Sequence, residues 1–91
     1  MVTVIGVYMQ SGMSEAQYRE VDEKLMASGV EPKGLKVHTC FGEDGHLSIF
    51  DVWESKEDFE ALAGTLGPIF TSLGIEPIQP EFVQMIDFRT A

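Results

Sequence analysis

Two segments in the middle of the chain, Leu35 to Phe41 and Leu47 to Trp53, are mostly apolar and rich in β-branched and aromatic residues. The tetrapeptide Gly42-Glu43-Asp44-Gly45 separates them, and Asp-Gly between two such runs predicts a β-hairpin with a two-residue type I′ turn. Counting back from that turn gives four cross-strand pairs: Glu43 with His46, Cys40 with Ile49, His38 with Asp51, and Lys36 with Trp53. A three-residue loop would shift the pairing by one residue and separate His38 from Asp51, so both registers stay open.

The two faces of this hairpin differ in polarity. In the direct register one face is mixed and carries His38, Cys40, Ile49, Asp51 and Trp53. The other face is more apolar and carries Val37, Thr39, Phe41, Ser48, Phe50 and Val52. Because successive side chains of a strand point to opposite faces, the two sets face different surroundings.

The flanking segments predict one more strand at each end and two helices. Val2 to Met9 is apolar on both alternating faces, which is typical of a strand covered on both sides. Ser14 and Gln17 form a capping box that begins a helix at Glu15, and Gly29 ends it.

Ser55 is the N-cap of a second helix, which we expect to be kinked or split at Gly67-Pro68. Phe82 to Phe88 is the last predicted strand. The order strand, helix, two strands, helix, strand predicts an α+β, ferredoxin-like βαββαβ fold in a single domain spanning residues 1–91. Both helices then cover one face of a four-stranded antiparallel sheet. The other face is too apolar for a monomer, so we expect a homodimer joined through the sheet faces.

Composition narrows the range of partners. The net charge is −9 and only six residues are Lys or Arg, so we expect no nucleic acid and no anionic membrane surface as a partner. The single cysteine, Cys40, cannot form an internal disulfide, and no basic segment typical of a signal peptide precedes the first strand. These features predict a cytoplasmic protein.

The element order, the Asp-Gly hairpin, the DVWES sequence at Asp51 to Ser55 and the LGP sequence at Leu66 to Pro68 resemble the dimeric α/β-barrel superfamily. The nearest branch is that of the antibiotic-biosynthesis-monooxygenase-like proteins, in particular small bacterial members of uncharacterised function. The resemblance implies a dimeric barrel but leaves the activity open, since the superfamily includes cofactor-free oxygenases, haem-degrading enzymes, isomerases and proteins without a known reaction.

The haem-degrading branch uses a Trp and a His in the second helix and an Asn on the first strand. Lys56 to Leu73 contains neither Trp nor His, and Val2 to Met9 contains no Asn. We therefore expect no haem and no other cofactor, and no zinc spacing predicts a metal site.

His38 and Asp51 are the candidate catalytic residues. A carboxylate on the neighbouring strand fixes the imidazole tautomer and raises its basicity, so His38 can act as a general base toward a phenol or an activated carbon acid. The candidate substrate-binding residues are Trp53, Tyr8, Tyr18 and Cys40. Two functions remain open. One is a cofactor-independent monooxygenase acting on a small aromatic or polyketide-like substrate, and the other is a non-catalytic homodimer that binds a small apolar ligand or serves a structural role.

Overall fold

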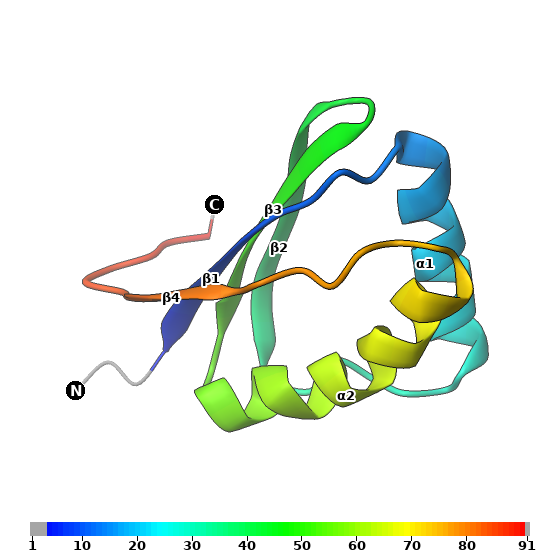
Figure 1. Cartoon of the computed structure of the whole chain (residues 1–91). Helices are drawn as coiled ribbons and strands as arrows, with labels where there is room; N and C mark the ends of the chain where they lie inside the picture. Colours follow the sequence, from blue (N-terminus) through cyan, green and yellow to red (C-terminus); the bar gives the residue numbers. More distant parts are fainter. Residues whose placement is uncertain (1–3, 91) are drawn as a thin grey trace.

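The computed structural model describes residues 4–90 and contains a four-stranded sheet with two helices. Its elements in chain order are β1 (Ile5–Gln10), α1 (Glu15–Ala27), β2 (Leu35–Glu43), β3 (His46–Trp53), α2 (Lys56–Ser72) and β4 (Glu81–Gln84). The strand order is β2-β3-β1-β4 and every neighbouring pair is antiparallel. Both helices lie on one side of the sheet (Figure 1), which confirms the predicted α+β, ferredoxin-like fold. Val2 and Thr3, the start of the first predicted strand, lie outside the described residues.

The hairpin has the direct register, one of the two that the sequence left open, with His38 opposite Asp51 and Glu43 opposite His46. The turn type was wrong. Gly45 has a φ of 86°, but Asp44 stays out of the positive-φ region that a type I′ turn requires at both central positions. Its carboxylate Oδ1 instead accepts a hydrogen bond of 2.7 Å from the backbone N–H of Glu15. This bond attaches the tip of the hairpin to the first turn of α1.

The predicted pairing of Lys36 with Trp53 was also wrong. The register shifts between Leu35 and Val37, and Leu35 lies opposite Trp53. Direct pairing would have placed the Lys36 ammonium on the face that packs against the helices, where an unpaired charge is unfavourable. The shift in register places Leu35 on the helix-facing side instead. Lys36 stays at the surface, where its Nζ lies 3.7 Å from the Glu54 carboxylate.

The helix ends follow their capping residues. Ser14 and Gln17 form the predicted capping box, and Gly29 has a φ of 75° just beyond the end of α1. Of the two predicted outcomes at Gly67-Pro68, the split does not occur, because α2 continues through Pro68 to Ser72. Pro68 has no N–H to donate within the helix, and Figure 1 shows α2 bending toward its C-terminal end.

The last strand is shorter than predicted, because β4 ends at Gln84 rather than Phe88. The next residue, Met85, instead packs across Gly6 on the sheet face away from the helices. A Cβ atom at Gly6 would lie 2.9 Å from the Met85 sulfur and 2.6 Å from Val83 Cγ2, so glycine allows this close approach. The chain therefore covers part of its own open sheet face, and Val52, which the sequence placed on that face, is buried.

The core lies between the sheet and the helices. Val7 and Trp53 from the strands are fully buried against Phe59 of α2, and the Trp53 and Phe59 rings meet edge to face with their centroids 5.8 Å apart. Within residues 4–90, no helix is both long and apolar enough to cross a membrane.

Candidate active site at His38 and Asp51

Asp51 is a buried carboxylate in an otherwise apolar row. Alternation along β3 directs Leu47, Ile49, Asp51 and Trp53 toward the helices, and Asp51 is only 5% exposed. Both carboxylate oxygens have donors. Oδ1 is 2.7 Å from His38 Nδ1, and Oδ2 accepts a hydrogen bond of 3.3 Å from the Trp53 indole N–H. Two donors from neighbouring positions therefore offset the unfavourable burial of this carboxylate.

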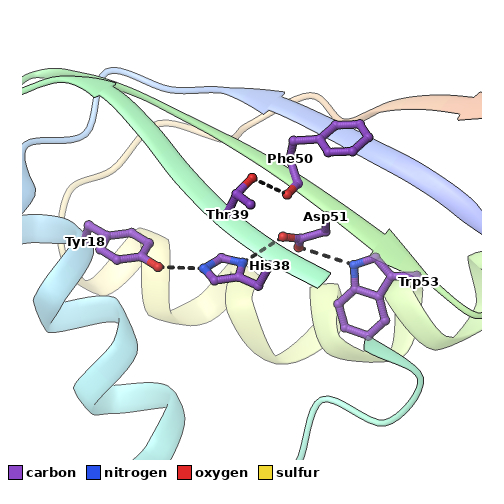
Figure 2. Close-up of polar contacts among 6 residues, drawn as sticks. All are labelled: Tyr18, His38, Thr39, Phe50, Asp51 and Trp53. Carbon is purple, nitrogen blue, oxygen red and sulfur yellow. Dashed lines mark hydrogen bonds and ion pairs between the residues drawn. The ribbon is translucent and has the colours of Figure 1, made fainter. Parts of the chain in front are cut away.

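His38 connects Asp51 to helix α1. Its Nε2 is 2.6 Å from the Tyr18 hydroxyl, and the two rings lie nearly parallel and end to end, with their centroids 6.1 Å apart. An ionised carboxylate can only accept hydrogen bonds, so His38 Nδ1 must carry the proton that is donated to Asp51. In the neutral ring, Nε2 then has no proton and is a hydrogen-bond acceptor. Tyr18 then donates its O–H to Nε2. Figure 2 shows Tyr18, His38, Asp51 and Trp53 joined in this order by hydrogen bonds.

The surroundings make His38 a stronger base than a free imidazole. The hydrogen bond to Asp51 raises the pKa of His38 above its ordinary value, more than partial burial lowers it, and the charges of Asp51 and Asp22 raise it further. Burial also raises the pKa of Tyr18, so its phenol stays protonated at neutral pH. The site therefore pairs a basic imidazole with a phenol that acts as a donor.

A cavity of about 180 Å³ lies between the helices and the inner sheet face, and it contains this hydrogen-bonded group. Its lining is mostly apolar and comes from β1, α1, β2, β3 and α2, with Met9, Leu25, Ile49, Leu62 and Phe70 among the lining residues. Four lining residues are titratable: Tyr18, Asp22, His38 and Asp51. A larger cavity, of about 280 Å³ between α2 and the segment before β4, is lined by no titratable side chain. We therefore assign the chemistry to the cavity beside His38.

The structure brings some of the predicted substrate-binding residues to this cavity and not others. Trp53 lines it but is fully buried, and its N–H positions Asp51. Cys40 lies on the same sheet face, opposite Ile49, but outside the cavity lining, and burial raises the pKa of its thiol. Tyr8 pairs with Phe50, whose ring points away from the Asp51 side of the sheet (Figure 2). Tyr8 therefore lies on the open face, away from His38.

Asp22 is the lining residue that sequence reasoning missed. It follows Tyr18 by four residues on α1, and this spacing places two side chains on the same helix face. This spacing could be read from the sequence, but an acidic residue on an amphipathic helix normally indicates a solvent-exposed surface. Within the described chain, no group of three or more His, Cys, Asp or Glu side chains is arranged to hold a metal ion.

Solved structures with very different sequences share this fold. SnoaB, a cofactor-independent oxygenase from Streptomyces nogalater, is 17% identical with a TM-score of 0.64, over 93% of this chain and 94% of that one. A Chloroflexus aurantiacus protein, provisionally named an antibiotic biosynthesis monooxygenase, is 11% identical with a TM-score of 0.67, over 97% and 98% of the two chains. The de novo designed protein Foldit4 is 11% identical with a TM-score of 0.53, over 90% and 96%.

No family model and no curated protein matches the sequence. At identities this low the likeness shows a shared fold and not a shared reaction, and the designed protein illustrates the difference. The chain therefore has the ferredoxin-like fold of the antibiotic-biosynthesis-monooxygenase-like proteins, as the resemblance of its sequence implied.

Proposed function

We propose that the protein is a cofactor-independent oxygenase acting on a small aromatic or polyketide-like substrate, with His38 as general base and Asp51 as the residue that orients it. One observation carries the proposal. The buried and fully hydrogen-bonded Asp51 holds an imidazole of raised pKa at the wall of an apolar cavity. The similarity in fold to SnoaB, a cofactor-independent oxygenase, supports the reaction class.

The proposed reaction needs no external reductant. His38 Nε2 takes a proton from an acidic C–H or O–H of the substrate, and the resulting electron-rich anion transfers an electron to O₂. Recombination forms a C–O bond and gives a hydroperoxide. Loss of water then leaves a carbonyl, so a CH₂ group and O₂ become C=O and H₂O. The substrate supplies all the electrons, and Asp51 stabilises the imidazolium that forms.

Tyr18 occupies the Nε2 lone pair before substrate binds. Its side chain is only partly buried on α1, so we propose that the phenol rotates off Nε2 when the acidic group of the substrate arrives. The hydroxyl then remains at the cavity wall as a donor to the substrate oxygen.

His38→Gln is expected to lower kcat/KM for a single-ring quinol substrate by about 10²- to 10⁴-fold, because it removes the base. Oxygen consumption with a panel of such compounds measures the loss. The matched control is His46→Gln, since His46 is the other histidine and lies exposed at the hairpin tip. Circular dichroism checks that both variants fold. Equal turnover by wild type and His38→Gln contradicts the assignment of the base, and absence of oxygen consumption across the panel contradicts the proposed reaction.

A second candidate function is a non-catalytic homodimer that binds a small apolar ligand. It is favoured by the hydrogen bonds on both ring nitrogens of His38, which is also the arrangement of a purely structural histidine. Ligand binding at the cavity without oxygen consumption would support this function over the first.

We also propose a homodimer that packs sheet to sheet. Phe41 is 50% exposed and Val83 is 40% exposed on the open face, with Val37 and Phe50 half-buried beside them. Such a patch is unfavourable in water and suits a second copy of itself.

Phe41→Glu is expected to weaken this dimer by at least about tenfold, because it places a charge in an apolar interface on both copies. Sedimentation velocity across a concentration series gives the dissociation constant. Met26→Glu is the matched control, since Met26 is 74% exposed on α1, away from the open face. A wild-type protein that stays monomeric at micromolar concentration would contradict the dimer.

We place the protein in the cytoplasm on the basis of its cysteine usage. Cys40, the chain's only cysteine, is a free thiol. A reducing compartment suits a small domain that depends on no disulfide.

A further inference from the structure

We infer that the His38 cavity selects a compound with a single aromatic ring and one acidic hydroxyl, and that Asp22 disfavours ring compounds that carry a carboxylate. The inference uses the site of the proposed function but concerns which ligand binds and not the reaction. It rests on the volume of the cavity, the charges on its wall and the acceptor that His38 Nε2 provides there.

The volume limits the ligand to one ring. An apolar protein cavity of about 150 Å³ is known to hold benzene. The His38 cavity, at about 180 Å³, has room for one ring with small substituents. A fused three-ring compound exceeds this volume, so part of it would extend into solvent and bury less of its apolar surface.

The charges on the wall disfavour anions. The lining contains the carboxylates of Asp22 and Asp51 and no Lys or Arg. Arg19 lies over the Tyr18 ring, with its Cζ atom 5.9 Å from the ring centroid, and it is paired with Glu15 at 3.6 Å. A carboxylate inside the cavity would thus meet like charges without a partner.

The hydrogen-bond acceptor that the cavity offers, His38 Nε2, is already bound by the phenol of Tyr18. The Tyr18 O–H donates to His38 Nε2 at 2.6 Å. A ligand hydroxyl of the same chemistry can make the same hydrogen bond once Tyr18 rotates away, and its ring then lies among the apolar side chains of the wall. The site thus provides one acceptor for one acidic hydroxyl.

The test compares 4-methylphenol with 4-methylbenzoate, which differ in charge but share a ring and a methyl group. Binding is followed by NMR at the indole N–H of Trp53, the only tryptophan, which binds Asp51 beside the cavity. Wild type is expected to bind the phenol about tenfold or more tightly than the benzoate. Asp22→Asn is expected to reduce the ratio of phenol affinity to benzoate affinity. Glu23→Gln removes a carboxylate from the next residue of α1, which lies outside the cavity lining, and is expected to leave this ratio unchanged.

Two further measurements complete the test. Tyr18→Phe vacates Nε2 and is expected to tighten 4-methylphenol binding by about two- to tenfold, because no hydrogen bond must be displaced. Anthrone, a three-ring compound, is expected to bind more weakly than 4-methylphenol. Equal binding of phenol and benzoate by wild type, equal effects of Asp22→Asn and Glu23→Gln, weaker phenol binding by Tyr18→Phe, or tighter binding of anthrone would each overturn the inference. Selective phenol binding without oxygen consumption by the quinol panel would support the inference and contradict the proposed reaction.

Discussion

Trp53→Ala is expected to lower the free energy of unfolding by about 3–5 kcal/mol, a large part of the stability of a domain this small. Trp53 is fully buried, its ring meets Phe59 edge to face, and its N–H binds the buried Asp51 carboxylate. Removing the indole leaves a cavity in the core and takes one donor from Asp51. Chemical denaturation followed by circular dichroism measures the change, since the variant has no tryptophan fluorescence.

Trp53→Phe separates the two contributions to that loss. Phenylalanine retains much of the ring but cannot donate to Asp51 Oδ2, so this variant is expected to lose about 1–3 kcal/mol for the unsatisfied oxygen in addition to a smaller packing term. If Trp53→Phe unfolded with the same free energy as wild type, the indole N–H would contribute nothing to holding Asp51. The positioning role assigned to Trp53 would then be wrong.

The pairing of His38 with Asp51 could be predicted from the sequence as one of two registers, because it depends on local geometry. The turn at Asp44-Gly45 sets the hairpin register. Because side chains alternate between the two faces with a period of two residues, the register at the turn also fixes the partner and the face of His38. The irregularity at Lys36 could not be predicted in the same way. It depends on which of Leu35 and Lys36 faces α1 and α2, and that choice is made by packing between elements far apart in the chain.

The hydrogen bond from Tyr18 to His38 was not predicted either. The two residues are 20 positions apart, and their contact depends on how α1 lies across β2. Helical periodicity places Tyr18 on the same helix face as Val21 and Leu25, but it does not determine which strand residue Tyr18 meets. The same limit applies to Tyr8, since its location on the open face follows from the β1–β3 register, a non-local pairing.

Asp51→Asn is expected to lower the pKa of His38, because it removes the hydrogen bond to a carboxylate, which is the largest cause that raises this pKa. Partial burial of the ring then remains and favours the neutral form. NMR titration of the His38 ring signals in wild type and variant measures the shift, and His46 provides an internal reference in each spectrum. Turnover of any active substrate is expected to fall by about 10²-fold, since a weaker base transfers the proton less readily.

The same substitution should change how stability depends on pH. In wild type the folded-state pKa of His38 is raised above its unfolded value near 6.5. Its contribution to stability is therefore complete below about pH 6.5 and is lost as pH rises through the folded-state pKa. In Asp51→Asn the pKa is lowered, so the contribution of His38 reverses sign and stability increases with pH below about 6.5. Unfolding free energies measured from pH 5 to pH 9 distinguish the two cases, and parallel curves for wild type and variant would show that Asp51 does not control the ionisation of His38.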